Sequence, residues 1–564
     1  MKGLDWVSCD RRLKLYWFSI LVVALGAFAV RAPRLSLRPM HTDEAVHADK
    51  FGKLLEGGAY EYNPNEYHGP TLNYFTLIPA WLTAADTYTK TTEVTLRIVP
   101  VIFGTVLVLL TLFLAEGLGL AAVLAAVLAA LSPAMVFYSR YYIQEMLLVC
   151  FTFGVIVCGY RYAKTMTLPW ALGTGVFAGL MHATKETCII ALGSMGLALA
   201  LGAVLRLGRG RPIRQAMAGM KPLHLVLGLA AAMGVSALFY SSFGSNPKGV
   251  LDSYLTYAGY FSRGAGENTM HVHPWHYYLQ IILFSRYFSG PIWTEGWIVL
   301  LAAVGLVGAV RGVRAGRIDS GLVRFIAWYT VTLTVAYSAV RYKTPWCLLS
   351  FLHGMILLAG VGAVMLLAWA RRPALRAGVI MLLATAAGHL AIQTYRANFI
   401  YCADSRNPYV YAHPTPEILI AVEKVKEYAG LGGLGYSERT PIQVVVPGKD
   451  YWPLPWYLRA YKVDWRTSVP EPNQIGPLIL ISDKLVGDLT DVLYEKMPRE
   501  KQRMYMPLFE APHYIWSRPM VKLMGFVRKD LWDERAYGRS NPIQPMEGRR
   551  GEQSPTAGNA VRGQ

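Results

Sequence analysis

Two adjacent acidic residues, Asp43 and Glu44, lie in the segment RPMHTDEAVHADKFG (residues 38–52), just after the first long apolar run of the chain. An alcohol is a poor nucleophile at neutral pH, so a reaction at a hydroxyl group needs a carboxylate that takes its proton. Neighbouring side chains at a helix start point in different directions. We therefore expect one acid to act on an acceptor while the other orients a cation or binds a metal ion. Capping of a helix that begins near Ala45 is the structural alternative.

Further ionisable residues stand next to other apolar runs. Positive charges among them could stabilise a phosphate group that leaves during a reaction. The structural alternatives are an ion pair between Arg140 and Glu145, and anchoring of Arg341 and Lys343 at a membrane interface. The set comprises His68, Arg140, Glu145, His182, Lys185, Glu186, Arg341 and Lys343.

The composition is that of a membrane protein. Of the 564 residues, 54% are hydrophobic and only 16% are charged, and the mean hydropathy is +0.30. A transmembrane helix needs about 20 mostly apolar residues, and we count roughly eleven such runs. They lie near residues 15–33, 95–115, 119–138, 143–160, 170–183, 187–205, 223–243, 291–310, 325–340, 346–370 and 377–395.

The net charge of +19 is concentrated in alternate connections between these runs. This distribution indicates membrane topology rather than nucleic-acid binding, because short basic loops stay in the cytoplasm. We expect a cytoplasmic N-terminus and, with an odd number of spans, an extracytoplasmic C-terminal segment. The basic connections are residues 1–14, 161–164, 206–221, 311–324 and 371–376.

This topology places the ionisable candidates at the outer ends of different spans, where one cavity could collect them. Unpaired charge at such positions is costly, which makes the residues functional candidates. In the first outer connection, EAVHADKFGKLLEG and GPTLNYFTLIPAWL have helix-like apolar spacing and are predicted to be interfacial amphipathic helices. The segment HVHPWH (residues 271–276) has no nearby acid to complete a metal site, so we interpret it as a turn before an aromatic interface cluster.

The chain after residue 396 has a different composition, with shorter apolar runs and more Pro, Tyr and charged residues. TPEILIAVEKVKEYAG and DKLVGDLTDVLYEKM are predicted helices, and IQVVV and PLILIS are predicted buried strands. These elements favour a small extracytoplasmic α/β domain at 396–540, followed by a disordered tail at 541–564. The aromatic segment PGKDYWPLPWYLRAYKVDW could bind a sugar, grip the membrane interface or pack onto the membrane domain.

Five segments in one order resemble motifs of the type C integral membrane glycosyltransferases, which include the protein O-mannosyltransferases and the aminoarabinose transferases of lipid A. HTDEAVHADKF is similar to their Asp-Glu motif, and EYHGPTLNYFTLI to their His-Pro-Pro-Leu-x-Tyr segment, with Gly69 in place of the first Pro. SRYYIQEMLLV, GLMHATKETCII and RYKTPWCLLSF resemble three further motifs, and Glu186 stands where glycine is usual. Within this superfamily the chain looks most like the flippase-activity-associated proteins of the archaeal N-glycosylation type.

The resemblance implies a role for each matching residue. Asp43 would be the catalytic base near the acceptor, with Glu44 beside it in the motif. The phosphate of the donor would be bound by Arg140, Lys185, Lys343 and Arg341. Supporting residues would be Glu145, His68, Tyr74 and Glu186, and a divalent cation held by His41, His47 and Glu44 stays an open alternative.

The sequence therefore predicts a mainly α-helical, multi-pass membrane domain at residues 1–395 with the type C glycosyltransferase fold. The predicted activity is inverting transfer of a sugar from a polyprenyl-phosphate donor to a protein, lipid or glycan acceptor on the outer face of the cell membrane. No nucleic-acid partner is expected. The alternatives are a transporter or flippase for lipid-linked glycans, and a non-catalytic scaffold for their assembly.

Overall fold

The structure is a computed structural model that describes residues 11–65, 68–207, 219–264, 271–312, 318–429 and 441–537. The predicted disordered tail at 541–564 and most of the basic connection at 206–221 lie outside these residues. Clustering of contacts divides the chain into two units. Unit 1 comprises residues 1–422, 448–460 and 515–522, and unit 2 comprises residues 423–447, 461–514 and 523–564. The predicted boundary at residue 396 stays a prediction.

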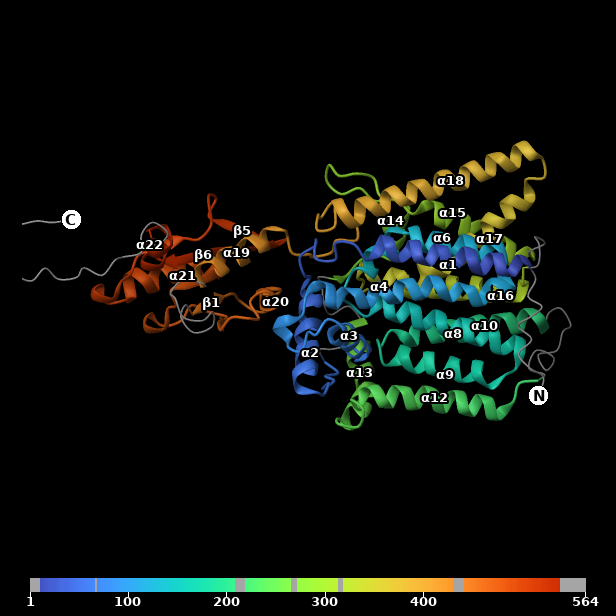
Figure 1. Cartoon of the computed structure of the whole chain (residues 1–564), viewed down its shortest axis with the longest axis horizontal. Coiled ribbons are helices and arrows are strands. Elements are labelled where there is room, and N and C mark those ends of the chain that lie inside the picture. The colour runs from blue at the N-terminus through green and yellow to red at the C-terminus, as the bar shows by residue number, and fades with distance from the viewer. Residues whose placement is uncertain are drawn as a thin grey trace, which may run out of the picture. The chain divides into compact units, whose positions relative to one another are not determined.

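All eleven predicted apolar runs are helical within unit 1 (Figure 1). Helices satisfy their own backbone hydrogen bonds, which a membrane interior requires. The predicted polar break at GLMHATKETCII is confirmed, because one helix ends at His182 and the next begins at Cys188. The helices are α1 (Arg11–Arg31), α4 (Glu93–Leu110), α5 (Ala115–Leu118), α6 (Leu120–Leu131), α7 (Pro133–Ser139), α8 (Glu145–Thr165), α9 (Leu168–His182), α10 (Cys188–Leu207), α12 (Pro222–Tyr240), α15 (Gly296–Arg311), α16 (Ser320–Ala339), α17 (Leu349–Trp369) and α18 (Pro373–Tyr395).

By length and composition, seven helices of the described part of the chain could cross a membrane. The number rises to eight if α6 and α7, which meet at a bend of 61°, form one broken span. The apolar segments Cys188–Val204 and Gly296–Arg311 are shorter. The chain is thus a multi-pass membrane protein, while the count of eleven spans and the orientation of the termini stay predictions.

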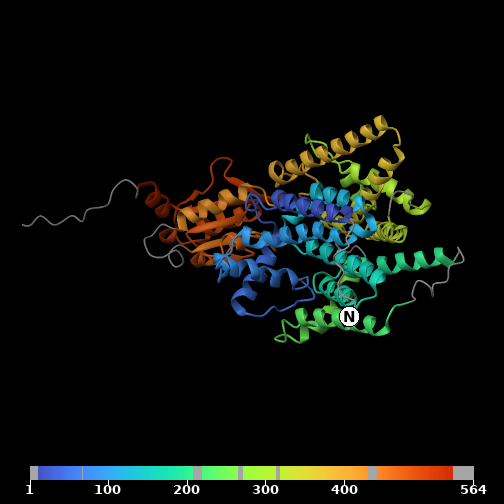
Figure 2. The ribbon, with the colours of Figure 1, turned by 45° about the vertical axis from the view of Figure 1, so that its right-hand side comes forward.

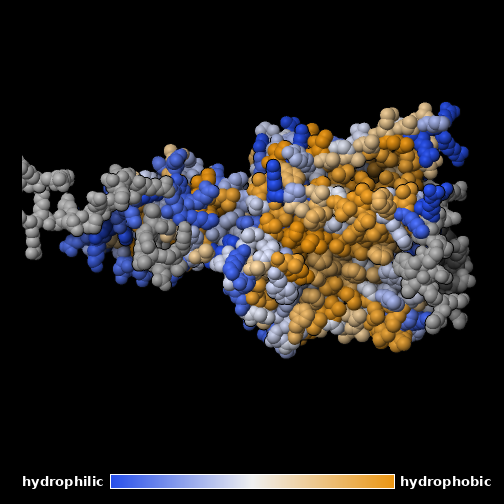
Figure 3. Space-filling model, viewed as in Figure 1, coloured by the Kyte–Doolittle hydropathy of each residue, from blue (hydrophilic) through white to orange (hydrophobic). Residues whose placement is uncertain are grey.

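The edges of the bundle are apolar. Helices α12 and α18 lie at opposite edges in both ribbon views (Figures 1 and 2), and only 17% of the apolar window of each is buried. The space-filling view shows a broad apolar surface over the membrane helices (Figure 3). Such a surface is suited to contact with lipid chains rather than with water.

Small residues allow close packing at the centre of the bundle. A β-carbon on Gly305 of α15 would lie 2.1 Å from the Leu358 carbonyl oxygen of α17. One on Gly362 of α17 would lie 2.0 Å from the Leu301 carbonyl oxygen. Glycine at both positions therefore lets two apolar helices approach each other closely, as is common in membranes.

The connection between α1 and α4 contains the two predicted amphipathic helices. These are α2 (Thr42–Gly57) and α3 (Thr71–Leu82), which lie at one end of the bundle beside α13 (Lys248–Gly264) (Figure 1). A short helix, α14 (Tyr277–Leu283), follows the HVHPWH segment, and residues 275–276 form a turn as predicted. The end of unit 1 that carries α2 also carries the candidate site.

The C-terminal region contains a mixed sheet with the order β2-β1-β3-β6-β4, and β5 pairs with β6. The predicted strands are confirmed as β1 (Ile442–Val445) and β3 (Leu478–Ser482), which are parallel to each other. The predicted helices are confirmed as α19 (Glu417–Ala429) and as a helical stretch that includes α21 (Val486–Asp491). The remaining strands are β2 (Val463–Arg466), β4 (Tyr505–Pro507), β5 (Tyr514–Arg518) and β6 (Val521–Arg528).

Candidate functional site

Helix α2 begins at Thr42, earlier than the predicted start near Ala45, and His41 is its N-cap residue. The Asp43 backbone N–H donates to His41 Nδ1 at 3.0 Å, and the His41 N–H donates to Glu44 Oε2 at 3.0 Å. This reciprocal arrangement satisfies two backbone donors that would otherwise lack partners at a helix start. The predicted capping role thus applies to Glu44, and it leaves the Asp43 carboxylate free of capping.

Glu44 is fully buried, and both of its oxygens accept several hydrogen bonds. Arg97 on α4 donates Nε to Oε1 and Nη2 to Oε2, each at 2.7 Å. The Tyr142 N–H donates to Oε1 at 2.8 Å, and Arg38 Nη2 lies 3.5 Å from Oε1. Such a two-pronged contact between arginine and a carboxylate is among the strongest polar contacts in proteins.

These contacts decide the ionisation of Glu44. Burial alone would raise the pKa of this carboxyl, but the charges of Arg97 and Arg38 and the hydrogen bonds from Arg97 and His41 lower it to about 2. The carboxylate is out of reach of a substrate. Its surroundings therefore favour a positioning role over the catalytic role that we predicted.

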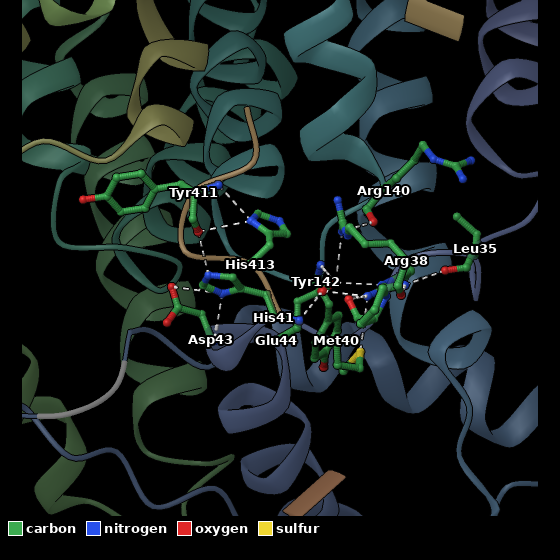
Figure 4. Close-up of polar contacts among 12 residues, drawn as sticks. Leu35, Arg38, Met40, His41, Asp43, Glu44, Arg140, Tyr142, Tyr411 and His413 are labelled. Atoms are coloured by element: carbon green, nitrogen blue, oxygen red, sulfur yellow. Dashed lines mark hydrogen bonds and ion pairs between the residues drawn. The ribbon is translucent and has the colours of Figure 1, made fainter. Parts of the chain in front are cut away.

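Asp43 is the more accessible of the two acids. Its side chain is 44% exposed, and its Oδ2 lies 3.9 Å from His41 Nδ1. Asp43 and Glu44 point to different sides of the helix start (Figure 4), as expected for neighbouring helix positions. The rigid Glu44 network thus holds one end of the helix while Asp43 remains open to an incoming group.

A segment that follows α18 packs against this helix start. His41 Nε2 lies 3.0 Å from the Tyr411 carbonyl oxygen. Because His41 Nδ1 accepts from the Asp43 N–H, the proton is on Nε2, which donates to Tyr411. The Tyr411 hydroxyl lies 2.8 Å from His271 Nδ1 and 3.5 Å from His273 Nε2. These contacts join residues more than a hundred positions apart and could not be predicted from sequence patterns.

Lys185 and Glu145 form a buried ion pair. Burial lowers the pKa of Lys185, but Glu145 outweighs this and the pKa is raised overall. Glu145 was predicted to pair with Arg140, and this is wrong, because the carboxylate contacts Lys185 instead. The ammonium group of Lys185 is thus charged and held at the start of α8.

The two residues that depart from the family motifs, Gly69 and Glu186, take part in neighbouring contacts between the start of α3 and the 183–186 loop. A β-carbon on Gly69 would lie 2.1 Å from the Ala183 carbonyl oxygen, so no other residue fits there without movement. Gly69 N–H donates to the Thr184 carbonyl at 3.1 Å, which joins the start of α3 to the 183–186 loop. Next to this contact, Glu186 Oε2 lies 2.9 Å from His68 Nδ1, and Tyr62 donates to Glu186 Oε1 at 3.0 Å.

His47 links the Asp43 side of the site to the Lys185 side. It is buried on α2, and burial lowers its pKa to about 3. Its ring centroid lies 6.2 Å from that of His68, and the charges of Asp43, Lys185 and Glu44 also act on its pKa. The structure therefore brings residues from three chain segments, near 43, 68 and 185, to one place.

Two other cations that were predicted to bind the donor phosphate, Arg140 and Lys343, form their hydrogen bonds with backbone carbonyls. Arg140 Nη1 donates to the Arg31 and Pro33 carbonyls, both at 2.6 Å, and its guanidinium stacks on Phe399. Lys343 is buried and donates to the carbonyls of His273 (3.3 Å) and Val340. Both cations are thus occupied by backbone groups.

Arg341 and Tyr74 complete the predicted set. Arg341 is exposed, and its carbonyl accepts from the His273 N–H at 3.2 Å. The Tyr74 hydroxyl contacts Ser242 in a separate apolar groove between α3 and α12, with a volume of about 460 Å³. Neither residue contacts the Asp43 and Lys185 groups directly in the polar contacts of the described residues.

The open alternative of a metal site at His41, His47 and Glu44 finds no support in the geometry. Glu44 is occupied by arginines, and His41 by backbone groups. Within the described ranges, no group of three or more His, Cys, Asp or Glu side chains is arranged to hold a metal ion.

Two segments from the C-terminal part of the sequence belong to unit 1. They form hydrogen bonds with residues at the starts of α2 and α4. Tyr457 accepts the Met40 N–H on its hydroxyl at 2.8 Å, and Trp456 donates to Glu93 at 2.8 Å. Arg518 donates to Thr42 Oγ1 at 3.2 Å and pairs with Asp450. Part of the predicted aromatic segment therefore packs onto the membrane domain, which was one of its three predicted alternatives.

Arg97 was not among the predicted site residues, although a signal was present. A lone arginine inside the apolar run at 95–115 is costly in a membrane unless it is paired. Such a residue needs a buried acidic partner, and the structure identifies this partner as Glu44.

Comparisons with known proteins agree with this architecture. Residues 41–245 match the family model described as dolichyl-phosphate-mannose-protein mannosyltransferase. The crystal structure of ArnT from Cupriavidus metallidurans in the apo state is similar with a TM-score of 0.58 and 13% identity, covering 90% of this chain and 97% of that chain. The same protein bound to undecaprenyl phosphate gives a TM-score of 0.56 at the same identity and coverage. None of the curated proteins matches the chain.

A weaker likeness exists to the Saccharomyces cerevisiae Pmt1-Pmt2 complex bound to the sugar donor, with a TM-score of 0.32, 18% identity and coverage of 44% of this chain and 35% of that chain. The predicted archaeal flippase-associated subgroup is not identified by these matches and stays a prediction. Because its helices are arranged as in ArnT and residues 41–245 match the mannosyltransferase family model, the chain has the fold of the type C integral membrane glycosyltransferases.

Proposed function

We propose that the protein transfers a sugar from a polyprenyl-phosphate donor to an acceptor at the outer face of the cell membrane, with Asp43 as the general base. The observation that carries the proposal is the contrast between the two motif acids. Glu44 is buried and saturated by arginines, whereas the neighbouring Asp43 carboxylate is 44% exposed on the helix start that Glu44 fixes. A rigid helix with one accessible carboxylate is what proton abstraction from an acceptor requires.

The proposed reaction is a single displacement at the anomeric carbon of the sugar. Asp43 takes the proton of the acceptor group, the acceptor atom forms a bond to the anomeric carbon, and the bond from that carbon to the phosphate oxygen breaks. Polyprenyl phosphate leaves with the bonding electrons. Attack from the side opposite the leaving group inverts the anomeric configuration. The acceptor is a protein, a lipid or a glycan.

Lys185 is the best-placed cation for the phosphate among the residues that we predicted. It is held by Glu145 rather than by backbone groups, and the charges of Lys185 and Asp43 both act on the buried His47 ring. Arg140 is kept out of this assignment because backbone carbonyls occupy its guanidinium. A phosphate that binds here would share the Lys185 ammonium with Glu145.

Replacing Lys185 with Met should weaken donor binding by roughly 10- to 100-fold, the usual value of a hydrogen bond to a charged group. Because this change also leaves Glu145 buried without its partner, the double variant Lys185→Met with Glu145→Gln serves as the matched control. The KM for the donor is measured for both variants. A high KM in both supports phosphate binding by Lys185, whereas a normal KM in the double variant would show that the pair is only structural.

The function itself is tested with purified protein and a polyprenyl-phosphate-linked sugar that carries a label in the sugar. Membrane extracts supply acceptors. We expect free polyprenyl phosphate and labelled sugar on an extracted protein or lipid in equal amounts. Absence of both products with every extract from cells that normally contain the protein would contradict the proposal.

A further inference from the structure

Four arginine side chains are buried close to one another at the outer end of the bundle, on the side of Glu44 that faces away from Asp43. They are Arg31, Arg38, Arg97 and Arg140, with relative exposures of 1%, 6%, 1% and 6%. In the described part of the chain, Glu44 is the one acid that forms an ion pair with any of them. Four buried cations therefore face one buried carboxylate, and uncompensated buried charge is costly.

The hydrogen bonds of these arginines are distributed unevenly. Arg97 donates to both Glu44 oxygens and to the carbonyls of Leu35, Arg38 and Pro39, so its guanidinium is fully used. Arg38 is different. Its Nη2 reaches the Arg140 carbonyl at 2.9 Å and Glu44 at 3.5 Å, while its buried Nε has no hydrogen-bond partner. A buried N–H of a charged group without an acceptor is rare and needs an explanation.

A small cavity lies where these arginines meet. Its volume is about 10 Å³, and Arg38, Arg97 and Arg140 line it together with Arg34, Asn398 and Cys402. This volume corresponds to about one water-sized sphere. No carboxylate lines the cavity. Leu35, Leu37 and Phe137 complete the lining, so the cavity is a small space with arginines and apolar side chains in its walls.

We propose that this cavity binds a single halide ion, chloride under ordinary conditions, between Arg38 and Arg140. The ion would accept a hydrogen bond from Arg38 Nε, which has no other partner among the described residues, and would lie near the charge of Arg140, whose Nη groups donate to backbone carbonyls. It would supply the negative charge that the cluster lacks. A phosphate group is far too large for a cavity of about 10 Å³, so the proposed ion is monatomic. A halide is larger than a water molecule, and its binding therefore requires the lining side chains to move outward slightly. The site is separate from the donor and acceptor groups around Asp43 and Lys185.

The electrostatics of Arg140 agree with this assignment. Burial, together with the charges of Arg38 and Arg97, lowers the pKa of Arg140 to about 9. A nearby anion would oppose this repulsion. Since Arg38 also touches Glu44, a bound halide would stabilise the network that positions the start of α2.

The test measures thermal unfolding of the full-length purified protein at constant ionic strength while sodium chloride or bromide replaces sodium gluconate. We expect a saturable rise of a few degrees in the unfolding midpoint. Bromide soaked into crystals should give an anomalous scattering peak between Arg38 and Arg140. Neither measurement uses the transfer reaction, so the outcome is independent of the proposed function.

A substitution at the wall of the cavity provides the matched pair of variants. C402D places a carboxylate beside Arg38 and Arg140 and should remove the halide response, because the protein then supplies its own negative charge. C402S keeps the neutral side chain and should respond as the natural protein does. A midpoint that is insensitive to halide in the natural protein, an unchanged response in C402D, or no bromide peak at the cavity would each overturn the proposal.

Discussion

The variant Asp43→Asn is expected to lose sugar transfer by roughly 100- to 10,000-fold in kcat, the usual contribution of a positioned general base. An amide cannot take the acceptor proton at neutral pH. The fold should be retained, because the Asp43 side chain is 44% exposed. Among the described residues its carboxylate pairs with no permanently charged group, and the uncharged His41 Nδ1 lies 3.9 Å from Asp43 Oδ2. The measurement is the initial rate of polyprenyl phosphate release at saturating donor, with thermal unfolding recorded in parallel.

Asp49→Asn is the matched control for this experiment. Asp49 lies on the same helix and forms an exposed ion pair with Lys53 at 2.8 Å. Exposed pairs contribute little to stability, so this variant should keep both its activity and its unfolding midpoint. Full activity of Asp43→Asn would show that another group takes the proton.

Glu44→Gln is the second variant for which we expect a large effect. It should lower the stability of the fold as well as the activity. The amide leaves Arg97 and Arg38 buried without an anionic partner, and breaking a buried ion pair in this way costs about 3–5 kcal/mol. We expect a marked fall in the unfolding midpoint, together with a loss of activity because the start of α2 is no longer fixed. Glu116→Gln is the control, since Glu116 pairs with Arg161 at an exposed position, where loss of a pair costs about 0–1 kcal/mol.

The same ion pair predicts a pH dependence. The pKa of Glu44 is lowered from its ordinary 4.5 to about 2 in the folded protein, so its contribution to stability is complete above pH 4.5. This contribution is lost as the pH falls from 4.5 toward 2, because the carboxyl group then takes up a proton in the unfolded chain while it stays ionised in the folded protein. The acid branch of the stability curve should therefore be flatter in Glu44→Gln. An identical acid branch in both proteins would contradict the ion pair.

Much of the fold could be predicted because it depends on local patterns. Continuous apolar runs predicted the membrane helices, and amphipathic spacing predicted α2 and α3. Strands β1 and β3 could be predicted from the short, mostly apolar runs IQVVV and PLILIS, and every residue in both strands is buried. Strand β2 was not predicted, because its four residues, VDWR, are partly exposed and charged.

The pairing of charged residues could not be predicted in the same way. Glu44 and Arg97 are 53 positions apart, and Glu145 and Lys185 are 40 positions apart. Which side chains meet depends on the rotation and depth of each helix, and sequence spacing does not give these. Arg140 is five residues before Glu145, yet it turns toward the carbonyls at the end of α1. Gly69 and Glu186 depart from the family motifs, and the packing partners that explain them are visible only in the structure.

The most direct measurement of the central claim follows the bond between sugar and phosphate in proteoliposomes. Vesicles that contain the protein, a polyprenyl-phosphate-linked sugar with separate labels on sugar and lipid, and an acceptor extract are sampled over time. The account predicts that the two labels separate, that the sugar appears on the acceptor with inverted anomeric configuration, and that Asp43→Asn stops this. Movement of the intact doubly labelled lipid across the membrane, without separation of the labels and unaffected by Asp43→Asn, would contradict it.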